Sequence, residues 1–123
     1  MNNKKTVVLG ATPNPSRYAF MAANMLKQYG HEVVPVGIKA GSVAGEKIQD
    51  IRELPQIDNV NTITLYIGPQ NQEEWYDYIL ELKPERIIFN PGTENTELAT
   101  KAKEAGIEST YGCTLVMLRA STY

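Results

Sequence analysis

Cysteine and histidine are almost absent from this sequence, with one of each in 123 residues. A lone cysteine excludes an intramolecular disulfide, and the chain contains neither an H-E-x-x-H nor a C-x-x-C pattern. Cys113 follows the last predicted strand, whereas His31 follows the first predicted helix, at the opposite end of the expected sheet. We therefore expect no metal site and no cysteine activated by this histidine.

Long apolar runs and a surplus of basic residues are missing too. No stretch approaches the roughly 20 apolar residues of a membrane-spanning helix, and the opening MNNKKTVVLG lacks the apolar core of a signal peptide. The formal net charge of -2 argues against a general nucleic-acid binder, which normally carries a basic excess on one face. We expect a cytoplasmic protein that binds neither membrane nor nucleic acid.

The overall composition is that of an ordinary soluble globular protein, with 42% hydrophobic and 21% charged residues. A chain of this length buries roughly two-thirds of the surface that its unfolded form exposes. The sequence contains no repeat and no linker, so we expect one domain over residues 1–123, with its first and last three residues loosely held.

Short apolar runs alternate with helical patterns along the chain. The expected strands cover residues 6–9, 32–36, 62–67, 86–89 and 107–111, and the expected helices cover 16–29, 72–83 and 94–105. The segment between residues 39 and 61 has mixed character and could hold one short helix in IQDIREL. Strands that alternate with helices indicate an α/β fold, here a three-layer, Rossmann-like, doubly wound parallel sheet of five strands.

Residues typical of helix N-caps stand before each expected helix. Asn14 is the expected cap of the first helix, with Pro15 at the first helical position. Asn71 and Glu74 resemble a capping box before the second helix, and Thr93 is the expected cap of the third.

Ligands of such sheets bind outside the carboxyl ends of the strands, near the point where the strand order reverses. The loops at these ends are residues 10–17, 37–41, 66–71 and 90–95. The acidic residues of the expected helix starts agree with the helix dipole, and no catalytic constellation emerges. We therefore expect no catalysis by this chain on its own.

The first of these loops has one glycine, Gly10, and lacks the G-x-G-x-x-G dinucleotide pattern. Backbone amides near Thr12 and at the helix start could meet a phosphate, with Arg17 adding a charged contact. Arg17 could equally be a solvated surface residue, since its unfavourable interaction with the helix dipole costs at most about 1 kcal/mol. Lys39 could likewise contact a phosphate or be an exposed surface residue.

Five segments in this order resemble the stand-alone CoA-binding domain proteins, which are related to the CoA-binding domain of the succinyl-CoA synthetase alpha subunit. The segments are VVLGATPNPSRYAF, GHEVVPVGIKAGSVAGEKI, LYIGPQNQEEW, IIFNPGTENTELATKAKEAGI and GCTLVM. The resemblance implies a Rossmann-like sheet of strand order 3-2-1-4-5 and coenzyme A or an acyl-CoA as the ligand. It implies no reaction.

The resemblance also implies where the ligand lies. Phosphates would meet the first turn, the nucleotide would meet the loop after the second strand, and the pantetheine arm would approach the fourth loop. Gly37 and Ile38 stand where the small family members usually have Asn-Pro. The ligand-binding residues implied are Gly10, Ala11, Thr12, Asn14, Arg17, Tyr18, Gly37, Ile38, Lys39, Tyr66, Ile67, Gly68, Pro69, Asn90, Pro91, Gly92 and Cys113.

Two other functions stay open at this point. One is binding of an NAD-type dinucleotide, although the carboxylate that holds the ribose hydroxyls after the second strand is missing. The other is the CoA-holding subunit of a multi-chain acyl-CoA ligase, which would need a partner chain. A homodimer is also open, and so are the acyl group and any reaction of Cys113 with a thiol.

Overall fold

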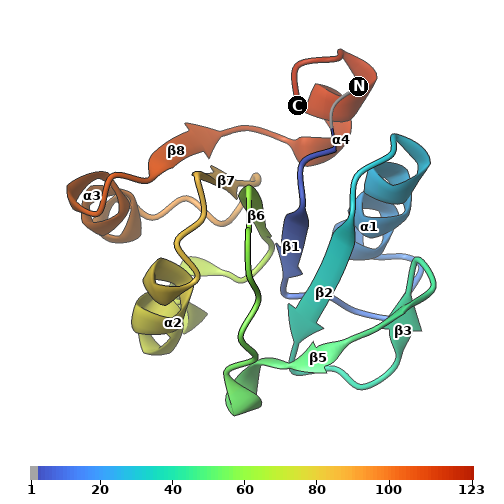
Figure 1. The fold of residues 1–123 in the computed structure, drawn as a ribbon, viewed down its shortest axis with the longest axis horizontal. Helices are drawn as coiled ribbons and strands as arrows, with labels where there is room; N and C mark the ends of the chain where they lie inside the picture. Colours follow the sequence, from blue (N-terminus) through green and yellow to red (C-terminus); the bar gives the residue numbers. More distant parts are fainter. Residues whose placement is uncertain (1–2) are drawn as a thin grey trace.

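The computed structural model describes residues 3–123, and in them it forms a six-stranded parallel sheet of order β5-β2-β1-β6-β7-β8. Every neighbouring pair in this sheet is parallel. The strands are β1 (Thr6–Leu9), β2 (Val33–Gly37), β5 (Gln49–Asp50), β6 (Thr62–Leu65), β7 (Arg86–Phe89) and β8 (Glu108–Tyr111). Figure 1 shows the sheet running through the middle of the molecule.

Helices cover both faces of the sheet, which gives three layers (Figure 1). The helices on one face are α1 (Tyr18–Gln28) and α4 (Thr114–Arg119), and those on the other are α2 (Tyr76–Glu81) and α3 (Thr96–Glu104). Side chains alternate along each strand, so Val8 packs on the α1 side while Val7 and Leu9 pack on the α2 side. Both faces are buried, which explains why the strands have nearly continuous apolar runs.

The predicted α/β fold class is confirmed, and the predicted number and order of strands need one correction. Gln49–Asp50 forms a short sixth strand that pairs with Val36 and Gly37 at the edge. Counted along the chain, the order becomes 3-2-1-4-5-6, with β6 beside β1. The predicted third strand, 62–67, therefore lies in the middle of the sheet, because the shorter β5 takes the edge position.

The connection between β2 and β6 holds more structure than its composition indicates. A two-stranded antiparallel hairpin, β3 (Ser42–Val43) and β4 (Glu46–Lys47), precedes β5. The helix expected in IQDIREL is present only as one 3-10 turn, η1 (Ile51–Glu53). Strands of two residues have no periodicity, so the sequence could not predict them.

The expected caps of the second and third helices are wrong. Two 3-10 turns, η2 (Pro69–Asn71) and η3 (Glu73–Trp75), come before α2, whose cap residue makes no side-chain cap bond. For α3 the cap is Asn95, whose Oδ1 accepts from the Leu98 backbone N–H at 3.2 Å. Thr93 instead donates its hydroxyl to the Asn90 carbonyl.

The end of the chain was expected to be loose, and this too is wrong for the final residue. Tyr123 is 7% exposed, and its ring packs 4.9 Å from the ring of His31. Its hydroxyl hydrogen-bonds with the Thr6 hydroxyl, and the Arg86 guanidinium lies 4.6 Å over the ring. The first two residues lie outside the described part of the chain.

His31 makes the stability of the fold depend on pH. Its Nδ1 accepts from the Lys4 backbone N–H at 2.9 Å. Burial, together with the nearby charges of Lys4 and Arg86, lowers the pKa of His31 below its ordinary 6.5. The unfolded chain then binds a proton that the folded chain does not, so the free energy of unfolding falls as the pH drops below 6.5. Urea unfolding from about pH 7.5 to about pH 5 measures this fall, which cannot exceed roughly 1.4 kcal/mol per pH unit.

The variant His31→Asn is the matched control. Its amide oxygen stands near the place of Nδ1 and can accept the same N–H, but the group does not titrate. The fall over this pH range should be lost or reduced in the variant. A fall of equal size in both proteins contradicts the assignment.

Candidate functional site

The loops after β1, β2, β6 and β7 open at one edge of the sheet, as the sequence predicts. β1 lies between β2 and β6, so the ends of these three strands are immediate neighbours. The strand order reverses between β1 and β6, which is where ligands bind in sheets of this kind. The candidate site is the edge formed by the carboxyl ends of the strands, as distinct from an edge strand such as β5.

The predicted site residues differ in their exposure at this edge. Those exposed are Asn14, Arg17, Tyr18, Ile38, Lys39, Pro69, Pro91 and Gly92. Those partly buried are Gly10, Thr12, Tyr66, Ile67, Gly68 and Cys113. Those buried are Ala11, Gly37 and Asn90. The exposed and partly buried groups can meet a ligand directly, whereas the buried ones shape the edge.

Two glycines are explained by the close approach of the backbones. Gly10 has φ +98, and a Cβ there would lie 3.0 Å from the Tyr66 carbonyl carbon. A Cβ at Gly37 would lie 2.8 Å from the Ala11 carbonyl oxygen, a distance that real Cβ atoms do not show. The Gly10 and Ala11 amides both donate to the Val36 carbonyl. These glycines let three strand ends crowd together, so they shape the edge whether or not a ligand is bound.

The first turn differs from the prediction in the role of Asn14. Its Oδ1 accepts from both the amide and the hydroxyl of Ser16, at 3.0 and 2.8 Å, and so closes a turn two residues ahead. Helix α1 therefore begins only at Tyr18, with Arg17 as its cap residue in extended conformation, φ −97 and ψ 148. The expected cap at Asn14 and the helical position of Pro15 are wrong.

This turn leaves backbone donors and a cation at the start of α1. Within residues 3–123, no protein acceptor meets the amides of Thr12, Tyr18 and Ala19. Arg17 is exposed, makes no side-chain cap bond and takes part in no ion pair among the described residues. Free amides at the start of an eleven-residue helix, beside a free guanidinium, are the usual chemistry of an anion site.

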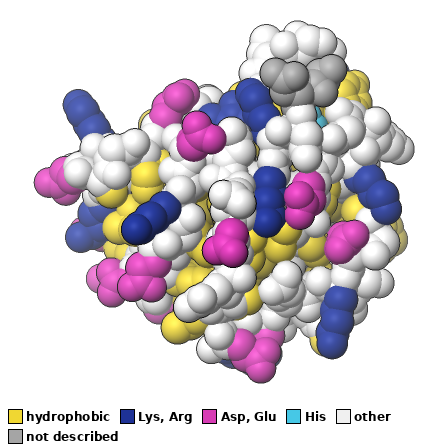
Figure 2. Space-filling model, viewed as in Figure 1, with side chains coloured by type: hydrophobic (Ala, Val, Ile, Leu, Met, Phe, Trp, Pro, Cys, Tyr) yellow, Lys and Arg dark blue, Asp and Glu magenta, His cyan; other side chains and the backbone are white. Residues whose placement is uncertain are grey.

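Basic and acidic side chains are interspersed on the face of the molecule that Figure 2 shows. Lys39 is exposed in the loop after β2 and makes no ion pair with a described residue. It supplies a second cation at the edge, on the β2 side of the first turn.

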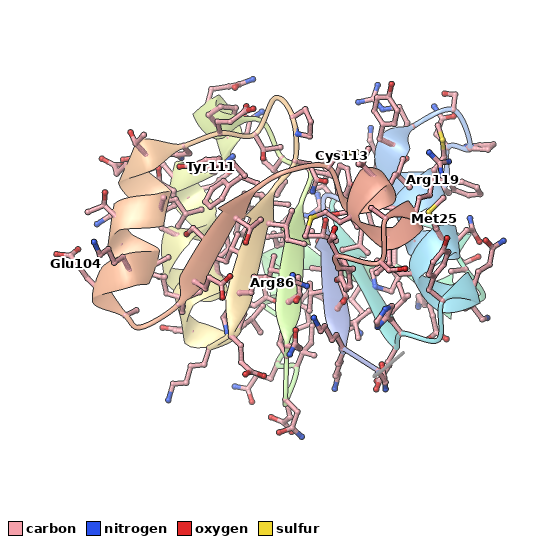
Figure 3. The ribbon with its side chains drawn as sticks, turned by 90° about the horizontal axis from the view of Figure 1, so that it is seen from above. Met25, Arg86, Glu104, Tyr111, Cys113 and Arg119 are labelled. Atoms are coloured by element: carbon pink, nitrogen blue, oxygen red, sulfur yellow. The ribbon has the colours of Figure 1, made fainter. Side chains whose placement is uncertain are left out.

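Tyr66 follows β6 and is partly buried at the other side of the edge. Burial raises the pKa of Tyr66 to about 12, an effect that hydrogen bonds with Thr64 and Thr114 oppose and the nearby Cys113 adds to. The phenol therefore stays protonated at neutral pH. Cys113 lies where the connection from β8 reaches α4 (Figure 3), a partly exposed thiol beside this phenol.

Asn90 is 2% exposed and joins three elements behind the edge. Its Nδ2 donates to the Thr64 hydroxyl and the Leu65 carbonyl, at 2.8 and 3.0 Å, and its Oδ1 accepts from the Thr114 amide at 2.9 Å. The hydroxyls of Thr64 and Thr114 are themselves 2.7 Å apart. With these bonds made, the side chain fixes the loop around it and does not face outward.

A second buried polar group, centred on Gln72, was not predicted. Its Nε2 donates to the Ile67 and Thr93 carbonyls, at 2.8 and 2.9 Å, which ties the loops after β6 and β7 together. Its Oε1 accepts from Asn95, which also donates to the Tyr76 hydroxyl. A fully buried glutamine in a polar stretch has no sequence signal, because NQEEW also suits a solvated helix start.

Other kinds of site find no support in residues 3–123. These residues include no group of three or more His, Cys, Asp or Glu side chains placed to hold a metal ion. His31 contacts the chain just before β1, whereas Cys113 follows β8, so the two lie at opposite ends of the sheet as expected. In the same part of the chain no helix has the length and apolarity to cross a membrane.

The architecture defines the class first: a Rossmann-like α/β protein with its candidate site at the switch point of a doubly wound parallel sheet. Residues 4–119 match the family model described as "CoA binding domain". The chain therefore belongs to this family of CoA-binding domains, as the five sequence segments indicated.

Solved structures share this fold. An uncharacterized protein is 57% identical over the whole of both chains, with a TM-score of 0.96. A hypothetical protein from Pyrococcus horikoshii OT3 is 25% identical over 98% of this chain and 84% of its own, with a TM-score of 0.83. A dinucleotide-forming acetyl-coenzyme A synthetase from Ca. Korarchaeum cryptofilum is 20% identical, with a TM-score of 0.69, and matches over 88% of this chain and 25% of its own, which shows a shared fold. No curated protein matches.

Proposed function

We propose that this chain binds coenzyme A or an acyl-CoA across the carboxyl ends of its strands, without catalysis of its own. The family makes CoA the ligand of first choice. The observation that carries the proposal is the start of α1, where, within residues 3–123, no protein acceptor meets the amides of Thr12, Tyr18 and Ala19 and no ion pair includes Arg17. In this proposal the CoA pyrophosphate lies over these amides, and Arg17 and Lys39 contact its charges.

The distribution of charge along the edge supports one direction for the ligand. The cations Arg17 and Lys39 lie with β1 and β2, whereas the side of β7 and β8 presents the uncharged Pro91, Gly92 and Cys113. We place the nucleotide on the β2 side. The pantetheine arm then follows the loop after β7, and the far end of the arm lies near Tyr66 and Cys113. Asn90 holds this loop in position and makes no contact with the ligand.

An NAD-type dinucleotide fits this edge less well. The ribose hydroxyls of NAD need a free carboxylate at the end of β2. The carboxylate beside that strand end belongs to Asp50, which pairs with Gly37. Two contacts of 2.8 and 3.0 Å bind it to the Arg52 guanidinium, so it is already in use.

Thermal unfolding in the presence of each ligand tests the proposal. CoA and acetyl-CoA should raise the midpoint by several degrees, because a ligand at one hundred times its Kd adds about 2.7 kcal/mol to stability. NAD and NADP at the same concentration should raise it little. Calorimetric titration then supplies the affinities. Stabilisation by NAD alone would overturn the proposal.

A further inference from the structure

Gln72 lies between the loops after β6 and β7, and its side chain is 0% exposed. A buried amide costs free energy unless it is hydrogen-bonded, and this one uses both of its hydrogens. Nε2 donates to the Ile67 carbonyl in one loop and to the Thr93 carbonyl in the other, at 2.8 and 2.9 Å. One side chain therefore fixes how far apart the two loops lie.

The loop after β7 is held at two points. At its start, Asn90 is bonded to the last residue of β6 and to the first amide of α4. Three residues later, the Thr93 carbonyl is held by Gln72. Between these points Pro91 and Gly92 are exposed, and a Cβ on Gly92 would meet no atom within 4 Å. The exposed middle of the loop is thus supported from both sides.

Asn95 extends this support to the helices that follow the two loops. Its Nδ2 donates at 2.8 Å both to Oε1 of Gln72 and to the hydroxyl of Tyr76, the first residue of α2. Its Oδ1 accepts from the Leu98 amide and so caps α3. The two loops and the first turns of α2 and α3 are therefore one hydrogen-bonded unit, with Gln72 at its centre.

We propose that Gln72 is a positioning residue for the pantetheine arm of CoA, because it sets the loops after β6 and β7 in place before the ligand binds. The inference rests on the proposed function and deepens it, since Arg17 and Lys39 serve the charged half of the ligand. The pantetheine arm is flexible and uncharged. Its binding is therefore weakened most when the loops along it must be ordered at the same time.

Calorimetric titration with CoA and with 3′-phospho-ADP tests the inference. The second ligand keeps the nucleotide and both phosphates of the pyrophosphate but lacks the pantetheine arm. The variant is Gln72→Met, which keeps an unbranched side chain of similar length and loses all three hydrogen bonds. We expect CoA to bind the variant at least about fivefold more weakly, and 3′-phospho-ADP to bind within about twofold of its affinity for the unchanged protein. A loss of folded protein alone would lower the binding of both ligands equally.

A second variant, Asn95→Ser, loosens the same unit from its other side. Serine can still cap α3 through its hydroxyl, but it is too short to reach Gln72 and Tyr76. The affinity for CoA should fall by about twofold or more, again without a change for 3′-phospho-ADP. The matched control is Tyr123→Phe, which removes a buried hydroxyl contact with Thr6 at the opposite end of the sheet and should leave the binding of both ligands unchanged.

The outcomes separate this inference from the proposed function. If CoA binds the unchanged protein but Gln72→Met weakens both ligands equally, or neither, the inference is overturned and the proposed function stands. If Gln72→Met does not fold, the same comparison with Asn95→Ser decides. If Tyr123→Phe weakens CoA alone to the same degree, the effect belongs to any lost buried contact and the inference also fails. If the unchanged protein does not bind CoA, the proposed function itself fails.

Discussion

Replacing Arg17 and Lys39 together by alanine weakens CoA binding at least tenfold. Each side chain is exposed at the ligand edge and has no competing ion pair among residues 3–123. A hydrogen bond to a charged group contributes about 1.5 to 3 kcal/mol, and a tenfold change corresponds to about 1.4 kcal/mol. Less than half of the smallest combined contribution of the two side chains therefore accounts for a tenfold loss of affinity. The remainder allows for screening by solvent, because both side chains are exposed.

Calorimetric titration of CoA into the double variant measures the loss. The matched control is the double variant Lys101→Ala, Lys103→Ala, which removes the same charge from the last turns of α3, away from the carboxyl ends of the strands. The control should bind CoA within about threefold of the unchanged protein, since distant surface charges are screened. Equal affinity in the Arg17, Lys39 variant and the unchanged protein would remove both residues from the site.

Circular dichroism should show that the double variant still folds. Arg17 and Lys39 make no side-chain hydrogen bond or ion pair with a described residue, so the free energy of unfolding should change by less than about 0.5 kcal/mol. A loss of CoA binding then reports on the ligand contact and not on the fold.

The sequence predicted most of this fold because the signals of its main strands are strong. TVVL, TITL and RIIF each become a buried central strand, with β7 at the predicted residues and β6 two residues shorter than predicted. Each has apolar or β-branched residues on both faces, which favours a parallel sheet covered by helices. The two-residue β5 carries no such signal, and without it the strand order could not be assigned correctly.

The sequence predicted which loops lie together better than it predicted the contacts of their side chains. Strand ends locate the edge, and the edge brings together the loops that were predicted. What the sequence could not give is the hydrogen-bond partners of the side chains in these loops. Asn14 and Thr93 have the residue types of helix caps, yet each bonds within its own turn. Caps depend on backbone angles that residue type alone does not fix.

Buried polar side chains were the hardest feature to foresee. Gln72 and Asn90 lie in stretches rich in turn-forming and charged residues, which usually face water. Their burial follows from the neighbouring loops, whose carbonyls and amides they satisfy. Three of these four contacts join residues 21 to 25 positions apart, and no local pattern encodes them.

Replacing Asn90 by alanine should lower the free energy of unfolding by about 2 to 4 kcal/mol, because the change leaves the Leu65 carbonyl and the Thr114 amide buried without their partner. Thermal unfolding should show a midpoint roughly 10 °C lower. Asn71→Ala is the matched control, since Asn71 is exposed and makes no side-chain hydrogen bond with a described residue. A change of less than about 0.5 kcal/mol is expected there.

The variant Asn90→Asp separates the loss of hydrogen bonds from the loss of volume, because it keeps the shape and one acceptor but loses both N–H donors. A carboxylate at this buried position has a raised pKa in the folded chain, so the folded state holds a proton that the unfolded state releases. The free energy of unfolding should therefore rise as the pH falls from about 7 to about 5, opposite in sign to the contribution of His31. A protonated carboxyl can donate one bond again, toward the Thr64 hydroxyl or the Leu65 carbonyl. If Asn90→Asp is as stable as the unchanged protein at pH 7, the donors of Asn90 do not hold this edge together.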